Sequence, residues 1–134
     1  MKILFVCMYN RFRSKVAEAM FLHYCKNKKI EVKSAGMRTD FLHLHMAKQV
    51  IDILNAKGIK ALDNGSRLVD EGLINWADKI VVVADNVSPE IFPAKKVLQW
   101  SVPDASEHDR TATLASMKMI EEEIKRFVKI YIEE

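Results

Sequence analysis

The 134-residue sequence contains only two cysteines, Cys7 and Cys25, and no apolar run long enough to cross a bilayer. So few cysteines exclude a disulfide-rich secreted scaffold. The short apolar run at the N-terminus continues directly into Asn10 and Arg11, which is unlike a signal peptide. We therefore expect a cytoplasmic protein with reduced thiols and no membrane segment.

An excess of charge of one sign is also missing, because 21 Lys and Arg residues face 18 Asp and Glu residues, for a net charge of +3. This balance suits an anionic ligand but does not indicate nucleic-acid binding, and the densest basic stretch, residues 26–33, holds no aromatic residue for stacking. His43 and His45 are two residues apart, so on a helix they would point to different sides. The sequence predicts no metal ion and no other cofactor.

The composition, 49% hydrophobic and 29% charged, is that of a soluble globular protein. The length suits one domain over residues 1–134. We expect this domain to be a monomer. Short apolar runs typical of strands alternate with longer stretches at helical spacing. The expected strands are 2–6, 31–34, 79–84 and 96–100. The expected helices are 13–24, 44–54, 66–76 and 109–131, with Gly58 ending the second and Ser106 capping the last, and a turn with a short helix is expected over 85–92.

This alternation predicts an α/β fold, in which a four-stranded parallel sheet carries helices on both faces as a three-layer sandwich. Residues 80–83 are all apolar and β-branched, which is typical of a central strand covered on both sides. Ligands of such sheets bind outside the carboxyl ends of the strands, where the strand order reverses. Cys7 ends the first strand at that edge.

Residues Met8 to Phe12, here called the cradle loop, lead from Cys7 into a helix that begins near Arg13 or Ser14. Backbone N–H groups at a helix start can converge on an anion in front of the sulfur. A free cysteine has a pKa of about 8.5, and a helix N-terminus with a nearby arginine lowers such values. We therefore expect a thiolate at Cys7, and we expect the Arg13 guanidinium to donate hydrogen bonds to two oxygens of a bound phosphate.

Two further side chains of this stretch have supporting roles in the prediction. The Ser14 hydroxyl can donate a hydrogen bond to the sulfur, and Asn10 can brace the loop through its amide. Met8, Tyr9, Arg11 and Phe12 complete the expected substrate-binding residues, with Arg11 facing solvent and Met8 at the mouth.

Attack of sulfur on phosphorus also requires a proton for the leaving alcohol, and a carboxylic acid is the natural donor. Asp104 follows the fourth strand and therefore lies at the same sheet edge as Cys7. Asp85 holds the corresponding place after the third strand, but with Asn86 and Ser88 behind it, it is interpreted as a helix cap. Asp104 is the preferred acid.

The stretch "FVCMYNRFRSKVAEAMF" resembles the opening of the low-molecular-weight protein tyrosine phosphatases, whose pattern is Cys-x-x-Asn-x-x-Arg-Ser followed by Ala-Glu. "KSAG", "SRL" and "ADKIVVVAD" extend the resemblance along the chain. It implies the flavodoxin-like fold of the phosphotyrosine phosphatase I class. It also implies a phosphocysteine on Cys7, with Asp104 first as acid and then as base. The expected partners are phosphotyrosine proteins or small phosphorylated substrates.

The chain departs from the family pattern at several positions around the site. Tyr9 replaces a common glycine, Phe12 a second cysteine and Lys15 a proline, and Ala105 follows the acid instead of proline. Ser106 and Glu107 stand where tyrosines often occur, and Asn64 stands in place of a histidine that joins Asn10 and Ser34. Without a cysteine at residue 12, the usual protective disulfide of the nucleophile is lost.

Two other functions stay open at this point. One is arsenate reduction, which uses a similar loop but would need external thiols here, because Cys25 is expected to pack in or near the core and to be redox-silent. The other is a phosphate-binding or phosphocysteine carrier module without turnover, against which the presence of Asp104 argues.

Overall fold

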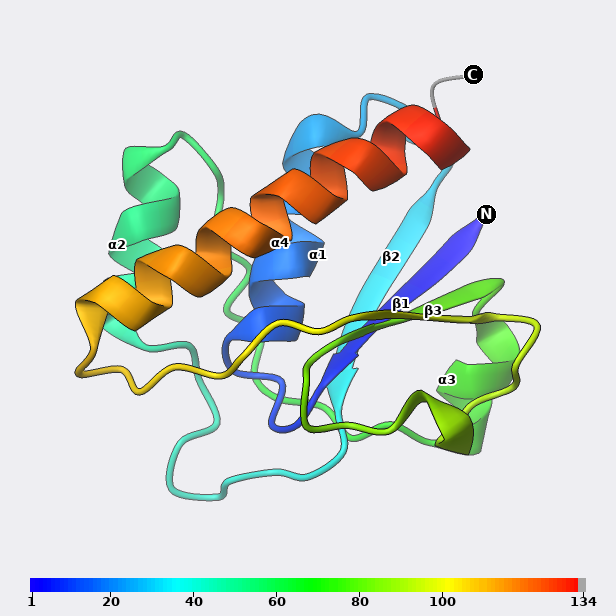
Figure 1. Ribbon diagram of the computed structural model, residues 1–134, viewed down its shortest axis with the longest axis horizontal. Coiled ribbons are helices and arrows are strands. Elements are labelled where there is room, and N and C mark those ends of the chain that lie inside the picture. Colours follow the sequence, from blue (N-terminus) through cyan, green and yellow to red (C-terminus); the bar gives the residue numbers. More distant parts are fainter. Residues whose placement is uncertain (133–134) are drawn as a thin grey trace.

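The computed structural model describes residues 1–132, which form a four-stranded parallel sheet with helices on both faces (Figure 1). This confirms the α/β fold predicted from the sequence. The elements in chain order are β1 (Lys2–Cys7), α1 (Arg13–Tyr24), β2 (Glu31–Gly36), α2 (Lys48–Ala56), α3 (Glu71–Trp76), β3 (Lys79–Val83), the 3-10 turn η1 (Pro89–Ile91), β4 (Val97–Trp100) and α4 (Arg110–Tyr131).

The strand order is β2-β1-β3-β4, with every pair parallel. From β1 the chain crosses through α1 to β2 on one side, and it later returns to β3 on the other side. The order therefore reverses at β1, and the last residue of β1, paired with Gly36 of β2, is Cys7. Cys7 thus lies at the point where parallel sheets of this kind bind their ligands.

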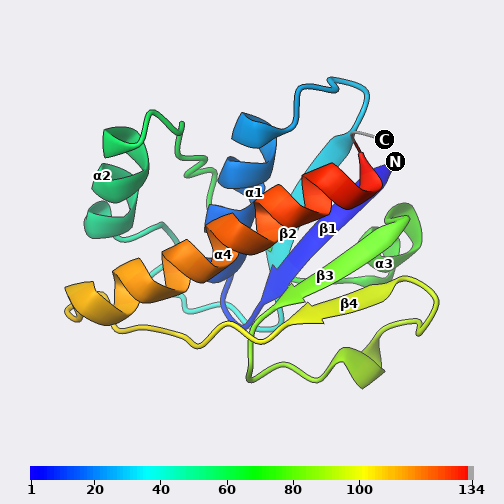
Figure 2. The same ribbon diagram turned by 45° about the horizontal axis from the view of Figure 1, so that its top comes forward.

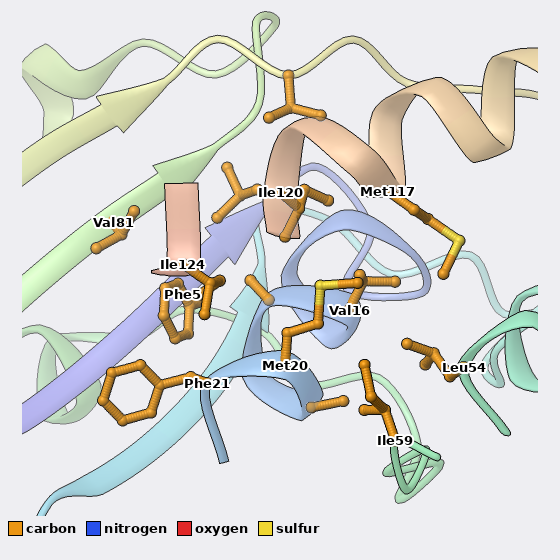
Figure 3. Packing of buried hydrophobic residues seen from close by; sticks show 14 of the residues in the cluster. Phe5, Val16, Met20, Phe21, Leu54, Ile59, Val81, Met117, Ile120 and Ile124 are labelled. Carbon is orange, nitrogen blue, oxygen red and sulfur yellow. The ribbon is translucent and has the colours of Figure 1, made fainter. Parts of the chain in front are cut away.

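Alternate residues of the strands build two separate layers of core. Ile3 and Phe5 of β1 face a cluster with α1 and α4, whereas Leu4 and Val6 face a cluster with α3. Figure 2 shows α1 and α4 crossing one face of the sheet and α3 on the other. In Figure 3, Phe5 lies beside Ile124 of α4, and its ring centroid is 6.1 Å from that of Phe21 of α1. Because a one-residue slip would reverse both layers, the strand register is strongly specified.

Helix α1 is enclosed along most of its length, since all nine residues from Arg13 to Phe21 are buried. At its far end Tyr24 donates a hydrogen bond to the Glu121 carboxylate of α4, with 2.6 Å between the oxygens. Burial and this carboxylate raise the pKa of Tyr24 to about 12, so the bond to α4 is present throughout the neutral and mildly alkaline range. The two helices that cover the sheet are thereby linked by a directional contact as well as by apolar packing.

Two of the expected helix starts and one expected helix cap are wrong. The second helix begins at Lys48 and not at residue 44, because Leu44 lies in the exposed loop after β2. The third begins at Glu71, since Leu68 pairs with Gly36 in a β-bridge and Asp70 caps the helix by accepting from the Leu73 N–H. In the fourth, Asp109 and not Ser106 is the cap, accepting from the Ala112 N–H.

None of the helices within residues 1–132 has the length and apolar character needed to span a membrane.

Candidate active site

Cys7 lies at the base of a cavity of about 290 Å³, close to the lower end of the 300–1,000 Å³ typical of small-molecule sites. The residue is only 2% exposed and is one of the residues that line this cavity. The walls come from the cradle loop, the segment after β2, the start of α2, the loop after β4 and α4. The lining residues are Cys7, Tyr9, Arg11, Phe12, Arg13, Asp40, His43, Ala47, Val50, Asp104, Ala105, Ser106, Glu107 and Thr113.

The backbone of the cradle loop packs directly on the end of β2. The carbonyls of Cys7 and Met8 accept hydrogen bonds from the N–H groups of Met37 and Arg38, at 3.1 and 2.8 Å. A Cβ atom built on Gly36 would lie 2.8 Å from the Asn10 nitrogen and 2.8 Å from the Tyr9 carbonyl carbon, closer than real Cβ contacts. Residue 36 must therefore be glycine if the loop is to keep this position.

Asn10 holds the loop from the inside. Its φ of 55° is in the left-handed region, which asparagine tolerates better than most residues, and its side chain is fully buried. The amide nitrogen donates to the hydroxyls of Ser14 and Ser34, at 2.7 and 3.0 Å, and the amide oxygen accepts from the Arg67 N–H at 3.0 Å. All hydrogen-bonding groups of the amide except one oxygen lone pair are thus used, which fixes its orientation.

The sulfur of Cys7 is 3.0 Å from the Ser14 hydroxyl oxygen. Because that oxygen already accepts from Asn10, its own hydrogen is free to point at the sulfur. The hydrogen-bond direction therefore runs from the Asn10 amide through Ser14 to Cys7, as the sequence analysis expects of these residues.

Arg13, the first residue of α1, is only 2% exposed and lines the cavity beside Cys7. Its Nη1 donates to the Val102 carbonyl at 3.0 Å, which orients the guanidinium plane. Nη2 lies 3.7 Å from a carboxylate oxygen of Asp104, and Nη1 lies 3.6 Å from one of Asp85. The guanidinium is thus held by the segments that follow β3 and β4, at the border of the cavity.

The interpretation of Asp85 as a helix cap is wrong. Ser88 caps the short turn η1 by accepting from the Glu90 N–H, whereas Asp85 approaches Arg13. Asp104 lines the cavity, as expected of the acid, and Asp85 lies behind the guanidinium as a second counter-charge. The position of Asp85 after a central strand, at the same sheet edge as Cys7, was the signal that could have placed it here.

The remaining cradle-loop residues divide between the cavity and the protein interior. Tyr9, Arg11 and Phe12 line the cavity, but Met8, expected at its mouth, packs against the apolar cluster on the α3 side. Arg11 is less solvent-facing than expected, because its Nε donates to the His45 carbonyl at 2.9 Å and its Nη2 lies 3.8 Å from Glu107. Glu107, one of the departures from the family pattern, therefore partners a residue of the cradle loop.

Sequence reasoning missed the cavity residues Asp40, His43, Val50 and Thr113, which reach the site only through the fold and carry no local motif. It also left open how the network around Asn10 is completed without a histidine. In the structure Asn64 accepts from the Lys15 ammonium, and the Arg67 N–H completes the contacts of Asn10. Within residues 1–132, no three His, Cys, Asp or Glu side chains gather as a metal site.

The family model for the low molecular weight phosphotyrosine protein phosphatases matches residues 2–134 of the sequence. The chain belongs to this family. The resemblance identified from the sequence is thereby confirmed.

Individual relatives do not all carry the same name. The chain is 30% identical to an arsenate reductase of Bacillus cereus over 130 residues, covering 95% of this chain and 93% of the relative. Among solved structures it resembles an arsenate reductase from Archaeoglobus fulgidus, with 31% identity, 95% and 98% coverage and a TM-score of 0.78. It also shares the fold of a low molecular weight phosphotyrosine phosphatase from Vibrio cholerae, with a TM-score of 0.87, 21% identity and 99% and 97% coverage.

The close approach at Gly36 generates a prediction for anion binding. In Gly36→Ala the new methyl group would collide with loop backbone, which cannot rotate away, so the cradle loop must shift. We expect inorganic phosphate to bind at least about tenfold more weakly by titration calorimetry, since a loop displaced by a few tenths of an ångström misplaces its donors. Gly58→Ala is the control, because its φ of 75° makes alanine strained there without any contact to the loop. Equal phosphate affinity in the two variants would contradict the packing argument.

Proposed function

We propose that this protein is a phosphatase that hydrolyses aryl phosphate monoesters of the phosphotyrosine type through a phosphocysteine on Cys7. The observation that carries the proposal is that the Cys7 sulfur, the Arg13 guanidinium and the Asp104 carboxyl border one cavity, with 3.7 Å between Arg13 and Asp104. Nucleophile, oxyanion binder and proton donor are the three groups that this reaction needs.

Arg13 and backbone N–H groups bind the phosphate dianion. The carbonyls of Cys7, Met8 and Phe12 are engaged with N–H groups of the fold, and that of Asn10 accepts from Ser66. Phe12 is the N-cap of α1 and makes no side-chain capping bond, so the first N–H groups of the helix can bind an anion. The cradle loop and the helix start together present donors in front of the sulfur.

In the first step the Cys7 thiolate attacks phosphorus, so that an S–P bond forms as the P–O bond to the aryl group breaks. The Asp104 carboxylic acid gives its proton to the departing aryl oxygen. In the second step the Asp104 carboxylate takes a proton from water, whose oxygen attacks phosphorus. The S–P bond breaks, inorganic phosphate leaves, and the Ser14 hydroxyl stabilises the returning thiolate at 3.0 Å.

The walls of the cavity support an aromatic substrate. Tyr9 and Phe12 offer apolar ring surfaces on the loop side, and Ala47 and Val50 add aliphatic surface opposite. A phenyl ring bonded to phosphorus through oxygen can lie between these surfaces while its phosphate occupies the cradle.

The proposal predicts different effects for the nucleophile and the acid. Cys7→Ser should lose turnover of p-nitrophenyl phosphate by at least about 10³-fold, because serine lacks an ionisable thiol. Asp104→Asn should lower kcat for phenyl phosphate by roughly 10²–10⁴-fold, and much less for p-nitrophenyl phosphate, whose leaving group needs less protonation.

The control is Asp52→Asn on the exposed face of α2, where the carboxylate pairs only with Lys48 at 3.4 Å. It should match the wild type with both substrates. Turnover that survives in Cys7→Ser, or an Asp104→Asn defect of equal size for both leaving groups, would contradict the assigned roles.

Arsenate reduction is the second candidate, favoured by two relatives of about 30% identity that carry this name. Arsenate is a tetrahedral oxyanion like phosphate, and Cys7 could form an As–S bond in the same way. Reduction to arsenite then needs a further thiol, which attacks the Cys7 sulfur. A disulfide forms as the S–As bond breaks and its electron pair stays on arsenic, so that two thiols together supply the two electrons.

The geometry argues against Cys25 as that thiol. The Cys7 sulfur contacts Ser14 in the first turn of α1 and Cys25 follows the end of that helix, and twelve helical residues span about 18 Å, whereas disulfide-bonded Cα atoms lie within about 7 Å. The candidate therefore predicts arsenite only when a thioredoxin or a small thiol is added, at the same rate in Cys25→Ser. Arsenite formed without an added thiol would contradict the geometry, and its absence with every thiol tested would remove the candidate.

A further inference from the structure

No step of the proposed reaction uses Lys15, although its side chain is buried. It lies in the first turn of α1, two residues after Arg13, and is only 3% exposed. Its ammonium donates to the side-chain oxygen of Asn64. Lysine is among the residues least often buried, so an ammonium in this position needs an explanation.

The charges around Lys15 are mostly negative. Glu18, one helical turn further along α1, Asp63 on the loop before Asn64, and the Cys7 sulfur all favour its charged form, whereas Arg67 opposes it. Burial has the largest effect and lowers the pKa of Lys15 from its ordinary value, but the three acidic groups act against this. The ammonium is thus buried beside residues 64–67, the segment whose Ser66 and Arg67 form hydrogen bonds to Asn10 of the cradle loop.

Glu18 is also the far end of the hydrogen-bond chain that reaches Cys7. Its carboxylate accepts from the Ser34 hydroxyl at 2.6 Å, and the Ser34 oxygen accepts from the Asn10 amide. The other amide hydrogen goes to Ser14, whose hydroxyl faces the sulfur. With Glu18 as acceptor, each hydroxyl in this chain has one direction in which its hydrogen can point. A cation beside Glu18 offsets the cost of burying that carboxylate.

We propose that Lys15 is a positioning residue for the nucleophile: its ammonium, held by Asn64, is a fixed cation behind the cradle loop that stabilises the Cys7 thiolate and the Glu18 carboxylate of the chain leading to it. This inference rests on the proposed function. It also assigns a common purpose to Lys15 and Asn64, two positions at which the sequence departs from the proline and histidine of the family pattern.

Other charged and titratable groups face Cys7 or the cavity around it, and the experiment holds them constant. They are Tyr9, Arg11 and Arg13 from the cradle loop and α1, Asp40 and His43 from the segment after β2, Asp85 after β3, and Asp104 and Glu107 after β4. Lys15 differs from all of them in that it acts from behind the loop, so its removal leaves the cavity walls unchanged.

The test is the pH profile of Cys7 alkylation by iodoacetamide, followed by mass spectrometry of the Cys7 peptide, since only the thiolate reacts. In Lys15→Met, which keeps the length of the side chain without its charge, we expect the midpoint to move upward by about one pH unit. At a pH below both midpoints, the alkylation rate should fall by about tenfold. Lys48→Met, a change on the exposed face of α2, is the matched control and should keep the wild-type midpoint.

Asn64→Ala covers the case in which Lys15→Met does not fold, because Asn64 is exposed and its loss only releases the ammonium. Its midpoint should move in the same direction by a smaller amount. A midpoint in folded Lys15→Met no higher than in Lys48→Met overturns the inference, as does an unmoved midpoint in Asn64→Ala if Lys15→Met is unfolded.

Alkylation also separates this inference from the proposed function. A protein that hydrolyses aryl phosphates but shows no Lys15-dependent midpoint keeps the function and loses the inference. A protein with the shifted midpoint but no turnover of any aryl phosphate keeps the cation behind the loop and loses the function.

Discussion

Both amide hydrogens of Asn10 are donated inside the protein, to Ser14 and Ser34, and its amide oxygen accepts from the Arg67 backbone. Left-handed backbone at a non-glycine residue costs about 1–2 kcal/mol, whereas three buried hydrogen bonds contribute about 0.5–1.5 kcal/mol each. The bonds therefore outweigh the strain, and the cradle loop keeps a single conformation. The position of the sulfur relative to Ser14 and the start of α1 depends on that conformation, so the chemistry of the site depends on an amide side chain that is bonded entirely inside the protein.

The sheet supplies the rest of the geometry. Because the strand order reverses at β1, the ends of β1, β3 and β4 bring Cys7, Asp85 and Asp104 to one edge, and Arg13 enters between them. A guanidinium that is 2% exposed would be costly without partners, and the Val102 carbonyl and two carboxylates supply them. In this arrangement Arg13 is fixed before any anion arrives, which lowers the reorganisation needed on binding.

The sequence predicted those parts of the molecule that local pattern determines. Strand β3 and the placement of Cys7 at a strand end followed from apolar runs and from the rules for parallel sheets, and the joint spacing of Asn10, Arg13 and Ser14 pointed to the cradle. Predictions from local pattern were wrong where a residue far away in the sequence determines the position of a side chain or segment. Asp85 looked like a cap because its neighbours favour one, but Arg13, 72 positions earlier in the chain, lies beside it. Residues 66–70 had helical spacing, but Leu68 pairs with Gly36 of β2. The burial of Lys15 could not be predicted from the sequence either. Every residue in the first two turns of α1 is buried, so the helix has no solvent-exposed face there on which a lysine would be expected.

The central claim is that the cradle loop and Arg13 hold a tetrahedral oxyanion directly in front of the Cys7 sulfur. A crystal structure of the protein with orthovanadate tests it most directly. The account predicts vanadium bonded to the Cys7 sulfur, with its oxygens within hydrogen-bond distance of the Arg13 guanidinium and of N–H groups of the cradle loop, and with Asp104 beside the outward oxygen. Vanadate bound elsewhere, or a Cys7 sulfur left unmodified at saturating vanadate with Arg13 still bonded only to Val102, Asp85 and Asp104, would contradict it.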